Sequence, residues 1–131
     1  MSASQNPALS ETIQDQTTQW LRTAAPVRGT LVRGIRFPDG TFITDGNPQA
    51  FPASALEAAW RVVADAFQVL RAHHLPPARL NWIYSRTILH CAQRADGAIL
   101  AVLVTRKNAE VDLASLNQLL LEFQTNVPPA A

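Results

Sequence analysis

The stretch Ala98–Val104, which reads AILAVLV, is the longest apolar run in the sequence. It is far shorter than the about 20 apolar residues that a membrane-spanning helix needs. A turn sequence, Ala95-Asp96-Gly97, separates it from the segment Thr87–Gln93, so the pattern predicts a β-hairpin with a tight turn. The second strand of this hairpin, Ala98–Thr105, is apolar on both faces. Such a strand in an antiparallel sheet is covered on both sides, so we expect a central strand with helices on each side of it.

The other elements are predicted from hydrophobic periodicity and from turn residues. In chain order they are a helix over 8–25, strands over 27–37 and 41–44, a helix over 54–74, a strand over 80–85, the hairpin described above, and a helix capped by Asp112. The sequence therefore predicts an α+β protein with the order helix, strand, strand, helix, strand, strand, strand, helix. Its length of 131 residues suits one domain, which we assign to 8–125 between flexible tails at 1–7 and 126–131.

The charge of the chain disfavours some classes of partner. Eleven basic and ten acidic residues give a net charge of +1, which is too small to attract nucleic acid or an anionic bilayer. The arginines are scattered from Arg22 to Arg106, which indicates a solvated surface rather than a nucleic-acid footprint. Cys91, the only cysteine, cannot form an internal disulfide, and the N-terminal sequence lacks a signal-peptide pattern. We expect a cytoplasmic protein with no nucleic-acid or membrane partner.

The helix over 54–74 has more apolar surface than one packing contact needs. At 100° per residue, one stripe holds large side chains, namely Leu56, Trp60, Val63, Phe67 and Leu70. A neighbouring stripe holds small ones, namely Ala55, Ala59, Val62, Ala66 and Val69. The large stripe suits a core against the sheet, whereas the small stripe lets another helix approach closely. Because no other predicted helix is free to reach it, we expect this partner to be the same helix of a second copy.

The strand over 80–85, LNWIYS, is predicted to pair with its own copy. Its large side chains, Leu80, Trp82 and Tyr84, share one face, and it contains no charge or proline that would protect an exposed edge. Interfaces favour such aromatic residues, although an ordinary core position is the alternative for each of them and for Trp60. The predicted dimer interface consists of Ala55, Ala59, Val62, Ala66, Val69, Leu80, Trp82 and Tyr84.

Glycine and aspartate mark the strand ends and turns. Gly29 and Gly34 lie inside the first predicted strand, where glycine indicates either a β-bulge or a close backbone approach, and we favour a bulge. Asp39, Asp45 and Asp96 stand in turn or strand-end sequences, so we expect their carboxylates to accept hydrogen bonds from nearby backbone amides.

No pattern in the sequence predicts a catalytic, cofactor-binding or metal-binding residue. His73 and His74 are neighbours at a helix end, so their side chains point about 100° apart and are poorly placed to share a metal ion. His90 and Cys91 are neighbours on a strand and emerge on opposite faces, which disfavours a thiolate–imidazole pair. The common nucleotide-binding, metalloprotease and hydrolase motifs are missing from the sequence.

The order of elements and several short segments resemble the Roadblock family of dynein light chain and small-GTPase regulators. The segments are Phe37–Thr41 (FPDGT), Arg94–Ala98 (RADGA) and Val102–Ala109 (VLVTRKNA), and the resemblance spans about Leu9–Phe123. It implies a three-layer α/β/α sandwich, in which a five-stranded antiparallel sheet lies between one central helix and the two terminal helices. It also implies dimers joined through the third strand and the central helix.

The resemblance further implies a function. Members of the family bind Ras-like GTPases, and some bacterial members accelerate GTP hydrolysis by repositioning the catalytic groups of the GTPase, whereas others are scaffolds. The family supplies no catalytic residue to transfer. The stretch 45–52, DGNPQAFP, is longer and richer in proline than the usual approach to the central helix. An arginine finger from Arg33, Arg36 or Arg86 is an alternative, because such a residue can contribute about 10³–10⁵ in GTP hydrolysis.

We therefore interpret the chain as a non-catalytic, homodimeric regulator or adaptor that binds a Ras-like small GTPase and modulates its GTP hydrolysis. A second Roadblock-like protein is an alternative dimer partner. Two alternative functions stay open at this point. One is a dimeric scaffold subunit with no effect on GTP turnover, and the other is a small-molecule sensor domain of related three-layer shape.

Overall fold

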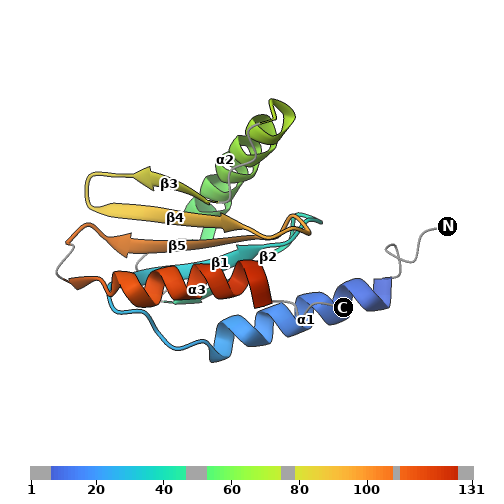
Figure 1. Ribbon diagram of the computed structural model, residues 1–131, viewed down its shortest axis with the longest axis horizontal. Helices are drawn as coiled ribbons and strands as arrows, with labels where there is room; N and C mark the ends of the chain where they lie inside the picture. The colour runs from blue at the N-terminus through green and yellow to red at the C-terminus, as the bar shows by residue number, and fades with distance from the viewer. Residues whose placement is uncertain (1–6, 47–52, 75–78, 108–109, 127–131) are drawn as a thin grey trace.

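The computed structural model describes residues 7–46, 53–74, 79–107 and 110–126. Its elements are α1 (Pro7–Thr23), β1 (Thr30–Arg36), β2 (Phe42–Gly46), α2 (Ala53–Ala72), β3 (Arg79–Ile83), β4 (Thr87–Gln93), β5 (Ile99–Thr105) and α3 (Leu113–Asn126). The predicted α+β order is confirmed (Figure 1). Both terminal helices extend into the tails that we predicted, because α1 begins at Pro7 and α3 ends at Asn126.

The five strands form one antiparallel sheet in the order β2-β1-β5-β4-β3. The predicted central strand is β5, which pairs with β1 on one side and β4 on the other. Its first six residues are all buried, as its apolar pattern predicted. β3 lies at one edge of the sheet and β2 at the other.

Helices cover both faces of the sheet, which confirms the three-layer arrangement (Figure 1). On one face, α2 supplies Trp60, Val63 and Phe67 to a core that also includes Leu89 and Leu103. On the other face, α1 and α3 pack together over the sheet, and the core there includes buried side chains from both helices, namely Leu21, Leu116, Leu120 and Phe123. The Trp20 indole Nε1 donates a hydrogen bond to Glu122 Oε1 at 2.6 Å and joins these two helices.

Both glycines of the first hairpin region permit a close approach that a Cβ atom would block, and our prediction of a bulge is wrong for Gly34. A Cβ atom at Gly34 would lie 2.5 Å from the Ile43 carbonyl oxygen and 3.1 Å from the Trp60 ring, so glycine here allows a close approach. The irregularity in the β1–β5 register lies earlier, between Thr30 and Val32. Gly29 precedes β1 with a φ of 93°, a backbone conformation that glycine adopts readily, and β1 begins only after it.

Two of the three strand-end aspartates have the predicted turn role. Asp39 Oδ1 accepts a hydrogen bond from the Thr41 amide, and Asp96 Oδ1 accepts one from the Ala98 amide. The prediction is wrong for Asp45, whose carboxylate instead pairs with the Arg33 side chain across the β1–β2 ladder. Asp112 caps α3 as predicted, because its Oδ1 accepts a hydrogen bond from the Ser115 amide at 3.1 Å.

Two arginines are buried, which corrects our assignment of all arginines to the solvated surface. Arg33 is 6% exposed, and its guanidinium donates hydrogen bonds to Asp45 and to three carbonyl oxygens at the C-terminal end of α1. Arg94 is 4% exposed, forms an ion pair with Asp96 at 2.8 Å and lies 5.0 Å from the centre of the Phe123 ring. Sequence periodicity could not identify either position, because it does not show that Arg33 meets carbonyl groups at the end of α1 or that Arg94 meets Phe123 of α3.

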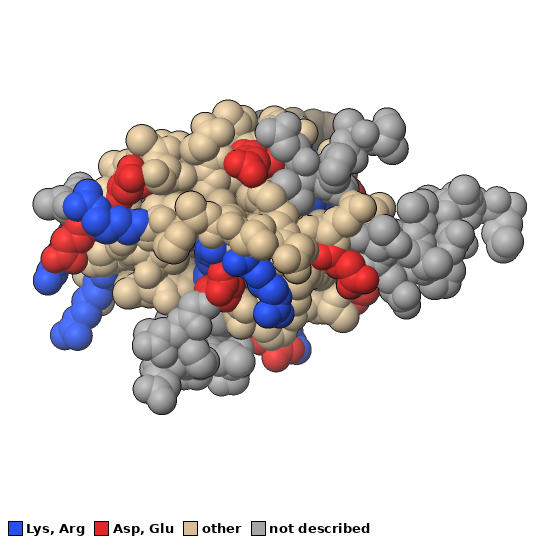
Figure 2. Space-filling view, turned by 90° about the horizontal axis from the view of Figure 1, so that it is seen from below, with Lys and Arg blue, Asp and Glu red and all other residues tan. Residues whose placement is uncertain are grey.

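The remaining charges are mixed in sign. Figure 2 looks onto the face covered by α1 and α3 and shows basic and acidic side chains interspersed there, without one dominant charge. Within the described ranges, none of the helices has the length and apolar character needed to cross a bilayer.

Candidate protein-interaction surface

The exposed side of α2 carries an apolar stripe that the described residues of a single chain leave uncovered. Trp60, Val63 and Phe67 are each at most 2% exposed because they pack against the sheet, as predicted for the large stripe. Val62 and Val69 of the neighbouring small stripe are 58% and 56% exposed. Exposed aliphatic side chains seven residues apart, about two helical turns, form a strip that a second helix can cover.

The alanines of the small stripe lie at the border between this strip and the core. Ala59 and Ala66 are both half-buried, and Ala59 packs against the core under α2. Their small size leaves the α2 backbone beside the two valines accessible to a close neighbour. The side chains of Ala55 and Leu56, which we also predicted in the stripes, lie outside the described side chains.

β3 presents the second part of the candidate surface. It pairs with β4 from Arg79 to Ile83 and is the last strand of the sheet, so among the described residues no strand pairs with its other edge. The backbone N–H and C=O groups along such an edge can pair with another strand. After Arg79 no charged residue follows until Arg86, so the sequence does little to prevent that pairing.

The predicted interface residues of this strand divide between core and surface. Leu80 and Trp82 are half-buried and pack against the core formed with α2, so they belong to the same side of the sheet as the α2 strip. Tyr84 lies just after β3 and is 46% exposed, and its backbone amide donates a hydrogen bond to the Thr87 carbonyl oxygen at 2.8 Å.

Sequence reasoning missed Ile83, which is 68% exposed and is the most exposed large apolar side chain among the described residues. We had considered only the face of the strand that carries the aromatic residues. On the opposite face, Arg79 Nε donates a hydrogen bond to Gln124 Oε1 of α3, whereas Ile83 has little cover. An isoleucine at the outward position of an unprotected edge strand is the signal that could have identified it.

The groups that could have supported catalysis are poorly placed for it. Cys91 is buried, and this burial raises the pKa of its thiol to about 12, so little thiolate exists at neutral pH. Burial lowers the pKa of His90, and the positive charge of Arg79 lowers it further. His73 and His74 are exposed at the C-terminal end of α2. Over the described part of the chain, histidine, cysteine and carboxylate side chains form no group of three that could hold a metal ion.

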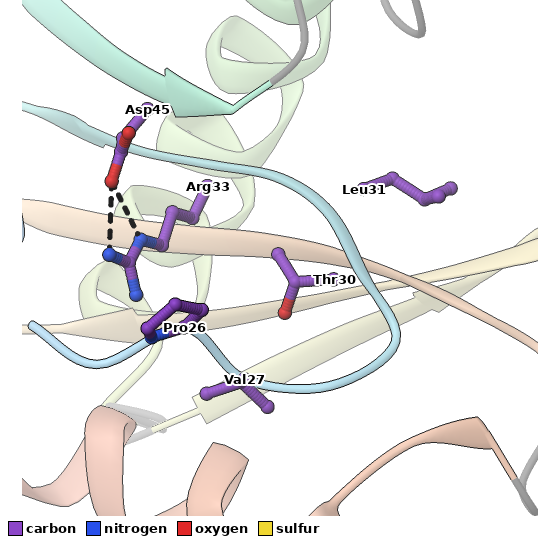
Figure 3. Close-up of a pocket in the computed structure, with 6 residues that line it drawn as sticks. All are labelled: Pro26, Val27, Thr30, Leu31, Arg33 and Asp45. Atoms are coloured by element: carbon purple, nitrogen blue, oxygen red, sulfur yellow. Dashed lines mark hydrogen bonds and ion pairs between the residues drawn. The ribbon is translucent and has the colours of Figure 1, made fainter.

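The three candidate arginine fingers differ in their surroundings. Arg33 cannot serve as one, because its guanidinium is buried and donates hydrogen bonds to Asp45 (Figure 3) and to carbonyl oxygens at the end of α1. Arg36 is half-buried at the end of β1, and Arg86 is exposed between β3 and β4. The unusual stretch 45–52 lies mostly outside the described residues.

Comparisons with known proteins bear on the fold of the chain. Neither the protein-family models nor the curated proteins include a match to the sequence. Among solved structures, a Roadblock/LC7 domain from Streptomyces avermitilis has a TM-score of 0.58 and 19% identity, covering 75% of this chain and 82% of its own. MglB from Myxococcus xanthus has a TM-score of 0.53 and 12% identity, covering 86% and 82%. A structure described as MglB with tetrameric arrangement has a TM-score of 0.54 and 15% identity, covering 82% and 79%. These similarities concern the three-dimensional fold.

Proposed function

Because the chain has the fold of Roadblock-like domains, we propose that it forms a homodimer and that this dimer binds and regulates a Ras-like small GTPase. In this proposal α2 packs against α2 of the second copy, and β3 pairs with β3 of the second copy. The chain supplies no catalytic residue of its own, and any effect on GTP hydrolysis arises from the catalytic groups of the GTPase.

The observation that carries the dimer is the combination of two uncovered surfaces. The side chains of Val62 and Val69 are each more than half exposed. The outer edge of β3, next to Leu80 and Trp82, has no partner strand among the described residues. Covering the strip removes apolar area from water, and pairing the edge satisfies backbone hydrogen-bonding groups. A single symmetric contact can do both, because a two-fold interface uses the same surface on each subunit. A solved structure with this fold is described as a tetramer, which also supports self-association.

Solution mass tests the dimer. The wild type should have about twice the 14.3 kDa mass of one chain, and Val62→Asp should shift it to the mass of one chain, because a carboxylate in a helix–helix contact must be desolvated. Leu121→Asp is the matched control: Leu121 is an aliphatic residue of α3, 47% exposed on the other face of the sheet, and its substitution should leave the dimer intact. A monomeric wild type, or a Val62→Asp variant that stays dimeric, would contradict the proposal.

The GTPase partner is supported by the fold and by the family resemblance of the sequence. The test is binding of purified Ras-like GTPases from the source organism, each loaded with GDP or with a non-hydrolysable GTP analogue. We expect one GTPase to bind the dimer with a nucleotide preference and its GTP turnover to change when the dimer is added. Val62→Asp should weaken this binding if the GTPase contacts both subunits.

The outcomes of these assays also distinguish the alternative functions. Nucleotide-dependent binding without any change in turnover would favour a scaffold or adaptor. If no GTPase binds in either nucleotide state, the regulatory proposal is wrong. The proposed dimer is tested separately, by the solution mass.

A further inference from the structure

A cavity lies beside α2, on the side of the helix that faces away from Val62 and Val69. This half-open cavity of about 250 Å³ is lined by Arg36, Pro38, Ala64, Gln68, Arg71, Gln93, Gly97 and Ile99. It is formed where α2 passes over the end of the sheet that carries the β1–β2 and β4–β5 turns. These two turns touch, because a Cβ atom at Gly97 would lie 3.6 Å from the Pro38 side chain.

The polar lining of this cavity is cationic and contains no carboxylate. The Arg36 side chain has no hydrogen-bond or ion-pair partner among the described residues. Arg71 donates a hydrogen bond from Nη2 to Gln93 Oε1, which orients the guanidinium and leaves its other N–H groups available. Two positive charges that face one cavity repel one another in the absence of an anion.

The acidic side chains of the two turns are engaged elsewhere. Asp39, in the β1–β2 turn, accepts hydrogen bonds from Thr41 and from Gln14. Asp96, in the β4–β5 turn, forms an ion pair with the buried Arg94. The hydrogen bonds to Thr41 lower the pKa of Asp39, so this carboxylate stays ionised in its own turn at neutral pH.

We propose that Arg36 and Arg71 form a binding site for a single doubly charged oxyanion of the phosphate type. Guanidinium groups present paired N–H donors that match the oxygens of phosphate, and the Gln68 and Gln93 amides add neutral donors. The net charge of +2 from the two arginines balances a dianion. The cavity is smaller than the about 300–1,000 Å³ of most small-molecule sites, so it fits one phosphate group rather than a whole nucleotide.

The site stays accessible in the proposed dimer. At 100° per residue, Gln68 projects about 120° and Arg71 about 180° away from Val62 around the α2 axis. An α2–α2 contact through the valine strip therefore leaves the cavity open. The proposal does not depend on the dimer or on a GTPase, and it gives the small-molecule sensor alternative a specific location on the molecule.

Titration of the full chain with inorganic phosphate at constant ionic strength tests the site. We expect a dissociation constant on the order of 1 mM or tighter, with NMR shifts of the Gln68, Gln93 and Gly97 amides. Arg36→Gln and Arg71→Gln should each weaken binding about tenfold or more. Arg61→Gln is the matched control, because Arg61 is an exposed α2 arginine outside the cavity lining, and its substitution should leave binding unchanged.

Two further measurements keep the proposal open to refutation. The Arg36→Lys variant keeps the positive charge but loses the paired N–H donors of the guanidinium, so it should bind phosphate more weakly than the wild type. Succinate at the same ionic strength tests for a carboxylate site. The proposal is overturned if phosphate produces no shifts at these amides, if Arg36→Gln and Arg71→Gln bind phosphate like the wild type, or if succinate binds more tightly than phosphate.

Discussion

Replacement of Arg33 with methionine should destabilise the protein far more than neutralisation of its ionic partner. The Arg33 guanidinium donates to Leu21 O at 2.9 Å, Ala24 O at 2.8 Å and Ala25 O at 3.2 Å, and to Asp45 Oδ2 at 3.0 Å. Carbonyl groups at a helix C-terminus lack intrahelical partners and carry partial negative charge. The guanidinium therefore acts chiefly as a cap for α1, tying that helix to β1.

The expected magnitudes follow from the exposure of each group. Arg33→Met leaves carbonyl groups without a charged donor, and removing one member of a buried ionic contact costs about 3–5 kcal/mol. Asp45→Asn should cost about 1 kcal/mol, because the Asp45 side chain is already 38% exposed, the amide oxygen can still accept, and the carbonyls still surround the guanidinium.

Urea unfolding followed by tryptophan fluorescence, at one fixed protein concentration, measures both variants. With a slope of about 2 kcal/mol per molar urea, a loss of 3 kcal/mol moves the midpoint down by about 1.5 M, whereas Asp45→Asn should move it by about 0.5 M. Equal losses for the two variants would show that the ion pair, rather than capping of α1, dominates, and a small loss for Arg33→Met would refute the capping role altogether.

Three further outcomes are expected. Gly34→Ala should lower the free energy of unfolding by about 2–3 kcal/mol in urea melts, because its Cβ would lie 2.5 Å from the Ile43 carbonyl oxygen; unchanged stability would contradict the close approach. Stability should fall as the pH drops below about 6.5, because burial lowers the pKa of His90 in the folded state and the unfolded chain therefore takes up the proton first. His90→Gln should reduce this pH dependence, and His73→Gln, which replaces an exposed histidine, serves as the control. Cys91, whose pKa burial raises to about 12, should react with iodoacetamide at neutral pH only after unfolding, and rapid labelling of the folded protein would show that the core under α2 opens.

Local sequence patterns were sufficient for the elements and for the centre of the sheet. The run Ala98–Val104 predicted a strand buried on both faces, and β5 has that position. The Asp-Gly turns and the Asp112 cap were also predictable, because each depends on residues within a few positions of one another. The exposed Val62 and Val69 followed from helical periodicity alone.

Features that depend on contacts between distant segments were not predictable in this way. The bulge expected at Gly34 was wrong because the reason for that glycine is the Trp60 ring and the Ile43 carbonyl group, which come from other elements. The outward position of Ile83 on an edge strand could have been found from the sequence, but only the packing of α3 against Arg79 shows how little of Ile83 is covered.

The helices, the strands, the turns and the central strand could all be assigned before the structure was known, because the periods of 3.6 and 2 residues and the turn residues are local properties. The environments of the arginines, in contrast, became known only from the folded chain. It buries Arg33 and Arg94, while Arg36 and Arg71 line a cavity free of carboxylates. A long charged side chain has no period that reveals its partners, and its solvation depends on groups that the fold brings together from β1, α2 and the hairpin turns.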